Sequence, residues 1–250
     1  MNRTPEEEPH SGMKPWVYKP SPLLEKTLVE RLTTFPREPS WTVSGLRLAG
    51  TFLLRALFGV YFRLRVVGRG HLPRHGPFVL VANHGSHLDA VALSCALPLR
   101  QWTHAYAAAA QDYFFRDFFR ALIAIVTTNA MPFDRREHPA RSLEQCADLL
   151  QVSREALVMF PEGTRSPDGS VQAFRPGVGR LVAGTEIPVV PAYIEGAASA
   201  WPKGSAIPKP RRVTVWIGAP RRYGNVAATR EGAMEIAEDL RRAVMALVPR

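Results

Sequence analysis

The stretch FVLVANHGSHLD, residues 78–89, decides how the fold is interpreted. Its first five residues are apolar and uncharged, which is typical of a strand buried on both faces. Ser86 and Asp89 have the spacing of a capping box, so we expect a helix with Ser86 as its N-cap. A strand that leads directly into a helix is the unit from which parallel sheets are built.

The chain repeats this alternation on both sides of the stretch. Further strand patterns occupy residues 63–67, 102–107, 130–133, 156–160, 187–194 and 212–217. Helix patterns occupy residues 89–97, 112–125, 139–152 and 231–248. We therefore predict an α/β fold in which helices flank a mostly parallel sheet. In such sheets ligands bind beyond the carboxyl ends of the strands.

Composition divides the 250 residues into three regions. Residues 1–40 hold seven of the 22 prolines and equal numbers of acidic and basic side chains, which predicts a proline-rich arm with one short helix. Residues 63–250 form the predicted catalytic domain. Acidic residues near the N-terminus and only two cysteines do not suggest an export signal or a disulfide scaffold, so we expect a protein of the cell interior.

Residues 41–62 predict a basic amphipathic helix. Apolar side chains recur at helical spacing, while Arg47 and Arg55 lie on another face. Arg55 interrupts an apolar run that is too short to cross a bilayer, which takes about 20 apolar residues. We expect the helix to associate with an anionic membrane surface, and the alternative is a core helix with a solvated basic rim.

His84 and Asp89 are the candidate catalytic residues. His84 follows a buried strand and Asp89 lies in the first turn of the next helix, so the carboxylate can orient the imidazole as a general base. Asp89 alternatively serves only as a capping residue. His84, His87 and Asp89 could instead ligate a metal, but no further ligand has a familiar spacing, and we predict none.

Two further loops supply candidate substrate-binding residues. The strand at 156–160 runs into a turn that contains Glu162, Gly163, Thr164 and Arg165, and Arg135 follows another short strand. Arginine binds phosphate through a planar pair of donors, although a structural turn with a local ion pair would have the same sequence. Both cysteines lie in helical patterns, so no enzyme nucleophile is evident.

Four ordered blocks of the chain resemble the glycerolipid acyltransferase family, which includes the 1-acylglycerol-3-phosphate (lysophosphatidate) acyltransferases. They are Asn83-His84 with Asp89, then 133–135, 160–166 and 187–191. The resemblance implies transfer of a fatty acyl group from acyl-CoA or acyl-ACP to a lysophospholipid hydroxyl, without a further cofactor, in phospholipid biosynthesis. His84 would be the base, Asp89 its orienter, and Arg135 with residues 162–165 the phosphate-binding set. From the amphipathic helix and the interior location expected above, we predict peripheral attachment to the cytoplasmic face of the cell membrane.

One departure from the family leaves the acceptor open. Members that act on lysophosphatidate often have a lysine before the second block, where this chain has four alanines at 107–110. A different lysophospholipid or another lipid alcohol is therefore an alternative acceptor.

The net charge of +10 and the pI of about 10.2 also suit a nucleic-acid-binding protein. Residues 196–230 contain seven basic residues and no acidic one. No recognised nucleic-acid motif accompanies this charge, and the aromatic residues at 113–119 follow an apolar helical pattern. We therefore expect an acyl donor, a lysophospholipid and an anionic membrane surface as partners, and no nucleic acid.

Overall fold

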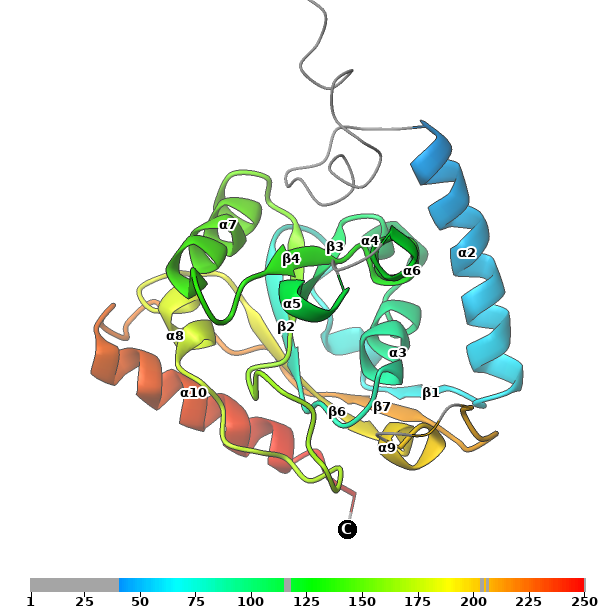
Figure 1. Cartoon of the computed structure of the whole chain (residues 1–250). Coiled ribbons are helices and arrows are strands. Elements are labelled where there is room, and N and C mark those ends of the chain that lie inside the picture. Colours follow the sequence, from blue (N-terminus) through cyan, green and yellow to red (C-terminus); the bar gives the residue numbers. More distant parts are fainter. Residues whose placement is uncertain (1–40, 115–117, 203–204, 206, 250) are drawn as a thin grey trace, which may run out of the picture.

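A computed structural model describes residues 41–114, 118–202, 205 and 207–249. Its centre is a seven-stranded sheet with the order β1-β7-β6-β2-β5-β3-β4 (Figure 1). The strands are β1 (Arg65–Val67), β2 (Phe78–Ala82), β3 (Ala105–Ala110), β4 (Met131–Phe133), β5 (Ala156–Met159), β6 (Val189–Glu195) and β7 (Thr214–Ile217). All neighbours pair in parallel except β6 and β7. The prediction of an α/β fold with a mostly parallel sheet is confirmed.

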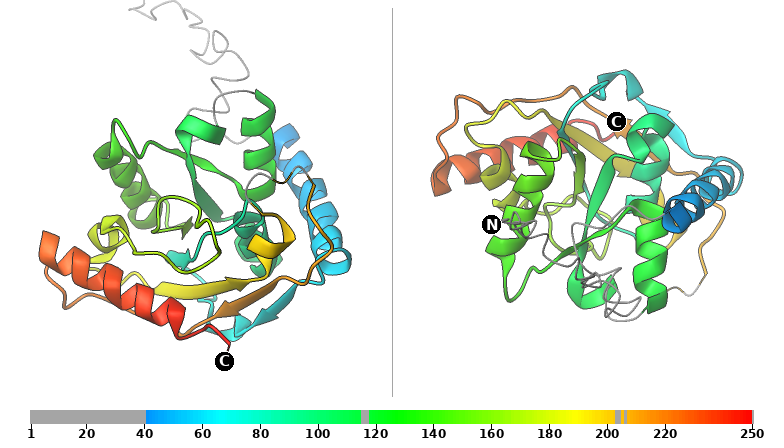
Figure 2. Two further views of the ribbon diagram at one scale, coloured as in Figure 1. Left: turned by 60° about the horizontal axis from the view of Figure 1, so that its bottom comes forward. Right: turned by 90° about the horizontal axis from the view of Figure 1, so that it is seen from above.

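Helices cover both faces of the sheet. One face carries α7 (Pro139–Gln151), α8 (Gly177–Val182) and α10 (Arg230–Met245). The other carries α3 (Leu88–Ala96) and α9 (Ala197–Ala200), with α6 (Phe118–Thr128) packed beside α3. The long helix α2 (Trp41–Val60) stands at the edge of the molecule, side by side with α6 (Figures 1 and 2). Short elements complete the fold: η1 (Arg69–His71), α4 (Leu99–Trp102) and α5 (Gln111–Phe114).

The uninterrupted apolar sequence of β2 reflects its central place in the sheet. Phe78, Leu80 and Ala82 belong to the hydrophobic core beneath α3 and α9. Val79 and Val81 point the other way, into the core beneath α7, α8 and α10. Alternate side chains leave a strand on opposite faces, so a strand covered on both sides needs apolar residues at every position.

Several boundaries differ from those expected from the sequence. The strand predicted at 102–107 is wrong at its start, because Trp102 ends α4 and β3 begins at Ala105. The helix predicted at 112–125 is replaced by α5 and α6. The six-residue α8 was not predicted, since so short a helix shows little periodicity. The arm at 1–40 lies outside the described residues, and so its predicted helix stays a prediction.

The amphipathic region is helical in its described part, and α2 ends at Val60. Leu48, Phe52, Leu53 and Val60 expose apolar surface on it, while Phe58 is buried. Among the helices that the structure describes, none is both long enough and apolar enough to span a membrane.

Candidate active site

The predicted site residues lie at one edge of the sheet. Strands β2, β3, β4, β5 and β6 all run in the same direction, so their carboxyl ends meet there. The loop after β2 carries His84, the loop after β4 carries Arg135, and the loop after β5 carries residues 162–165. Motifs far apart in the sequence are brought together by the parallel arrangement.

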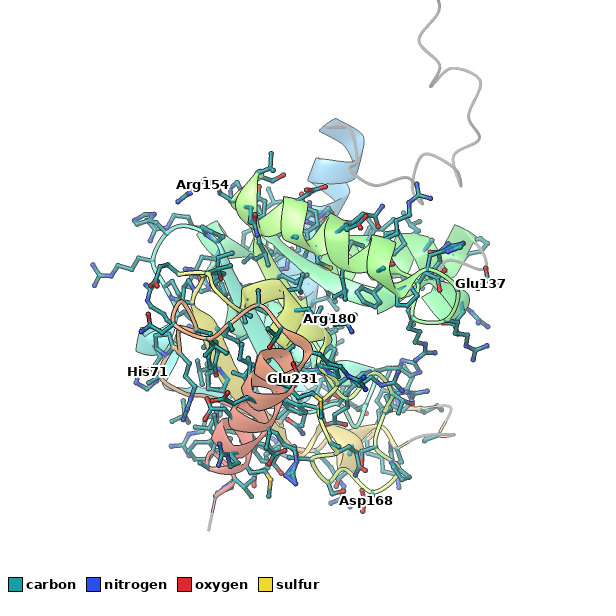
Figure 3. All side chains as sticks on the ribbon, turned by 90° about the vertical axis from the view of Figure 1, so that its left-hand side faces the viewer. His71, Glu137, Arg154, Asp168, Arg180 and Glu231 are labelled. Atoms are coloured by element: carbon teal, nitrogen blue, oxygen red, sulfur yellow. The ribbon has the colours of Figure 1, made fainter. Side chains whose placement is uncertain are left out.

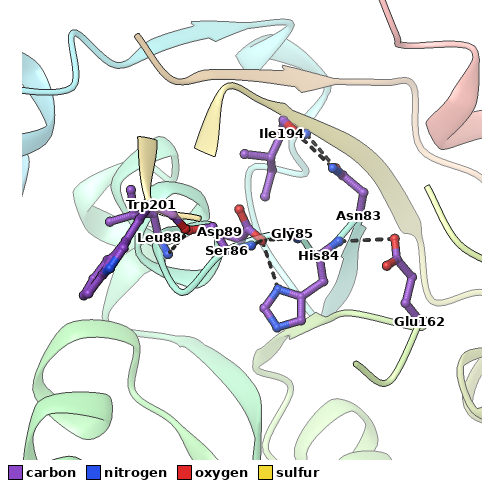
Figure 4. A network of polar contacts seen from close by, with 9 residues as sticks. All are labelled: Asn83, His84, Gly85, Ser86, Leu88, Asp89, Glu162, Ile194 and Trp201. Atoms are coloured by element: carbon purple, nitrogen blue, oxygen red, sulfur yellow. Dashed lines mark hydrogen bonds and ion pairs between the residues drawn. The ribbon is translucent and has the colours of Figure 1, made fainter. Parts of the chain in front are cut away.

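His84 and Asp89 form a hydrogen-bonded pair (Figure 4). Nδ1 of His84 lies 2.9 Å from Oδ2 of Asp89, and the imidazole stacks on the ring of Phe160 with a centroid distance of 4.3 Å. A carboxylate accepts only, so Nδ1 donates the hydrogen of this bond, which in the neutral imidazole places the lone pair on Nε2. Within the described part of the chain, Nε2 has no hydrogen-bond partner. The histidine side chain is 22% exposed, whereas that of Asp89 is 2% exposed.

Asp89 also organises the loop that precedes it. The same Oδ2 accepts the backbone N–H groups of Gly85 and Ser86, each at 2.7 Å. The same carboxylate can therefore cap the loop and contact His84 at once, so the two interpretations of Asp89 do not exclude each other. The N-cap prediction was wrong by one residue: His87 occupies that position, and the Ser86 hydroxyl accepts the N–H of Leu88 and donates to the carbonyl of Trp201.

The backbone around His84 is fixed from neighbouring strands. The side-chain amide of Asn83 donates to the carbonyl of Ile194 and accepts its N–H, which extends the pairing of β2 with β6 (Figure 4). The carbonyl of His84 accepts the N–H of Ser166 at 2.7 Å. These contacts hold the imidazole at the end of β2 without using its Nε2 atom.

Glu162 is buried instead of facing a substrate. It is 4% exposed, and its Oε1 accepts the backbone N–H of His84 at 3.2 Å (Figure 4). It does not line the cleft described below. Its Oε2 has no hydrogen-bond partner among the described residues. Burial raises the pKa of Glu162 to about 7, and the carboxylate of Asp89 acts in the same direction. This placement gives no support to the expected contact between Glu162 and a phosphate.

Arg135 is held at the mouth of the site by two partners. Its Nη1 donates to the carbonyl of Gly163 at 2.8 Å, and its Nη2 lies 3.2 Å from both carboxylate oxygens of Asp112. Gly163 has a φ of +72°, and a Cβ there would lie 2.8 Å from Nε of Arg175. The turn therefore needs glycine both for its backbone and for the close approach of a second guanidinium.

Thr164 and Arg165 both line the cleft, and their role in substrate binding stays a prediction. The Arg165 guanidinium makes no hydrogen bond or ion pair with any residue in the described ranges. Burial, together with the charge of Arg165, lowers the pKa of His87 to about 4, so His87 is neutral at pH 7. His87 packs edge-on against the ring of Trp201.

His84 opens onto a cleft of about 1180 Å³. Its apolar part is formed by α2, α6 and the alanines of β3, with Trp201, Pro202 and Pro208 at one side. Among the described residues that line it, the fully charged ones are all arginines, namely Arg120, Arg135, Arg165, Arg175 and Arg180. Figure 3 shows Arg180 on α8, between α7 and α10. The cleft thus joins an apolar surface to a rim of arginines that attracts anions.

The described residues contain no cluster of three or more histidine, cysteine, aspartate or glutamate side chains that could hold a metal ion. Both cysteines are free and buried. Burial raises the pKa of the Cys95 thiol to about 11 and that of Cys146 also well above its usual value. Neither thiol has the lowered pKa of a reactive cysteine.

Sequence reasoning missed three groups at this site. Asp112 enters the sequence analysis only as the first residue of the helix predicted at 112–125, and its pairing with Arg135 depends on how β3 and β4 align. Arg175 and Arg180 follow the loop at 163–166, and their positive charge was the only available signal. Neither the alignment nor the fold of α8 is encoded in a local motif.

Comparison with known proteins places this site in a family. The family model described as Acyltransferase matches residues 63–195, just over half of the chain. The chain therefore belongs to the acyltransferase family.

The similar proteins carry more specific names. A crystal structure of the 1-acyl-sn-glycerophosphate acyltransferase PlsC from Thermotoga maritima superposes with a TM-score of 0.61 and 26% identity, covering 83% of this chain and 80% of that one. The 1-acyl-sn-glycerol-3-phosphate acyltransferase of Limnanthes alba is 36% identical over 32% of this chain and 30% of its own length. The alpha form from Ovis aries is 26% identical over 60% of this chain and 50% of its own length. The chain thus spans half or less of these two curated relatives.

Proposed function

We propose that this protein transfers a fatty acyl group from acyl-CoA or acyl-ACP to the hydroxyl of a lysophosphatidate-type glycerolipid in phospholipid biosynthesis. The observation that carries the proposal is the His84–Asp89 pair, whose open Nε2 faces an apolar cleft with a basic rim. Membership of the acyltransferase family and the names of the similar proteins support the same reaction.

The pair acts as a general base with an orienting carboxylate. Nε2 of His84 takes the proton from the acceptor hydroxyl while its oxygen attacks the thioester carbonyl. Asp89 stabilises the imidazolium that forms. The carbon–sulfur bond then breaks, and the departing thiolate takes up the proton that Nε2 received from the acceptor hydroxyl. Since a thiol has a pKa of about 8.5, it leaves readily, and activation of the alcohol is the demanding step.

The remaining site residues have distinct roles in this proposal. Arg165 and Arg175 bind the anionic part of the substrates, because both guanidiniums line the cleft without an ion-pair partner among the described residues. Arg135 fixes the turn through Gly163 and becomes available to phosphate if it exchanges its contact with Asp112. Glu162 positions the base by holding the N–H of His84, and so it acts through His84.

The exposed apolar face of α2 supports peripheral attachment to a membrane, at the cytoplasmic face in our proposal. Leu57 of α2 and Ile123 of α6 line the cleft and are also exposed on the surface. A protein that rests on the bilayer through α2 and α6 would therefore receive lipid chains directly from the membrane.

A second acceptor class follows from the surroundings of Arg135. Asp112 pairs with both Arg135 and Arg136 and so offsets part of the charge of Arg135, and the alanines at 107–110 add no cation where the family often has a lysine. A lysophospholipid with a phosphodiester headgroup, or another lipid alcohol, carries less negative charge than lysophosphatidate and so needs fewer cations in its binding site.

The deciding experiment is a headgroup panel. The purified protein is given one acyl-CoA together with lysophosphatidate, glycerol-3-phosphate or a phosphodiester lysophospholipid, and ester formation is measured. We expect lysophosphatidate to be consumed fastest and His84→Gln to be inactive on every acceptor. Preference for a phosphodiester would establish the second class. Acyl transfer by His84→Gln, or loss of activity on chelation with EDTA, would contradict the proposed mechanism.

A further inference from the structure

A second, smaller cavity lies on the far flank of α2. It has a volume of about 450 Å³ and is lined by Arg55, Gly59, Leu64, Val66, Arg69 and Cys95. None of these residues lines the active-site cleft, which is bounded by Leu54, Phe58 and Tyr61 on the opposite flank of the helix. The two sites are therefore separated by α2 itself.

The cavity contains two cations and no counter-charge from its lining residues. Arg55 donates from Nη2 to the carbonyl of Leu97 at the end of α3, but its buried Nε has no partner among the described residues. Arg69 forms no ion pair with a described residue. Burial lowers the pKa of Arg55, the Cys95 thiol opposes this shift, and the charge of Arg69 acts in the same direction as burial.

The sequence explains why no carboxylate compensates these arginines. No acidic residue occurs between Pro39 and Leu88 or in residues 196–230, which together supply α2, β1, η1 and β7. The thiol of Cys95 is neutral, because its pKa is raised to about 11. An anion from outside the chain would therefore bind without competition from a neighbouring acid.

An apolar stripe continues the cavity along the helix. Leu48, Phe52, Arg55 and Gly59 are spaced by four, three and four residues, so they share one face of α2. Leu48 and Phe52 are 50% and 56% exposed. A cationic cavity beside an exposed apolar stripe matches the two parts of a phospholipid, a phosphate headgroup and its acyl chains.

We propose that the cavity between Arg55 and Arg69 binds the headgroup phosphate of an anionic phospholipid of the bilayer, with its chains along Leu48 and Phe52. This inference rests on the proposed membrane attachment. The site would fix how α2 lies on the membrane and so orient the active-site cleft on its other flank.

The test is flotation with vesicles of phosphatidylcholine, with or without phosphatidylglycerol, using the full chain and two variants. We expect wild type to bind more strongly when phosphatidylglycerol is present, and Arg69→Gln to lose about fivefold in binding to those vesicles. Arg69 is exposed and forms no described side-chain contact, so the variant should fold and retain acyl transfer in detergent.

Arg65→Gln is the matched control. Arg65 neighbours Val66 on β1, carries the same charge, and points to the other side of the strand, outside the cavity. Equal losses in both variants would show diffuse attraction and overturn the inference. If wild type binds equally to vesicles with and without phosphatidylglycerol, the headgroup site is refuted but membrane attachment is not. If wild type binds neither kind of vesicle, membrane attachment is refuted as well.

Discussion

Glu162 offers a sharp test of how the loop after β2 is held. Its carboxyl is buried, its Oε1 accepts the His84 N–H, and its Oε2 is unpartnered among the described residues. Burial raises its pKa from 4.5 to about 7. Because the folded-state pKa lies above the unfolded-state value, the stability from this group is present below pH 4.5 and is lost as the pH rises to about 7.

The magnitude follows from the size of this shift. At 1.36 kcal/mol per pKa unit, the shift corresponds to about 3 kcal/mol. Water in the adjacent cleft screens part of it, so we expect about 2 kcal/mol. Glu162→Gln keeps a carbonyl oxygen to accept from His84 and cannot ionise. The free energy of unfolding of the variant relative to wild type should therefore rise by about 2 kcal/mol between pH 5 and pH 8.

Urea unfolding at the two pH values measures this difference. Titration of all other groups is common to both proteins and cancels in the comparison. Glu144→Gln serves as the control, since Glu144 is exposed on α7 and should show no relative change with pH. If Glu162→Gln differs from wild type by the same amount at both pH values, the ionisation of Glu162 does not oppose folding and the reasoning from burial is refuted.

Three further substitutions test the site. Asp89→Asn should lower kcat by about 10²-fold or more, because an amide is a weaker acceptor than a carboxylate for Nδ1–H and the two loop N–H groups. Steady-state kinetics measures the loss, and an unchanged circular dichroism spectrum would show that the variant is folded. Arg165→Ala should raise KM for a phosphate-bearing acceptor about tenfold at similar kcat, and an unchanged KM would make Arg165 structural. Gly163→Ala should lower thermal stability by about 1–3 kcal/mol, from the positive φ and the contact with Arg175, and a wild-type melting temperature would contradict the strained turn.

The sequence predicted the parts of the molecule that depend on local patterns. The limits of β2 could be read from its apolar run, and the proximity of His84 and Asp89 followed from a strand that leads directly into a helix. The place of Glu162 could not be predicted in this way. It lies in the same turn as Arg165, but whether a side chain turns inward or toward the cleft depends on the packing of β5 against β2.

The segment before β4 shows the other limit. An apolar, aromatic stretch at 112–125 predicts one helix, whereas the structure has two, and Asp112 pairs with Arg135 from a different strand loop. Ion pairs between distant segments depend on sheet order, and nothing in a single sequence reports that β3 lies between β5 and β4.

The division between predictable and unpredictable parts has a physical cause. The reacting groups need fixed positions, so the loop at 83–89 is held by Asp89 from within, by Glu162 from β5 and by Asn83 through β6. Such hydrogen bonds require particular residue types at particular spacings, so the loops at this edge of the sheet can be recognised in the sequence. The cleft wall needs only to be apolar and open. Many apolar side chains would meet that requirement as well as those of α2, α6 and the alanines of β3. The candidate catalytic pair is therefore encoded in a few motifs. The groups that select the acceptor in our proposal are spread over Asp112, the arginine rim and helices that do not belong to the sheet.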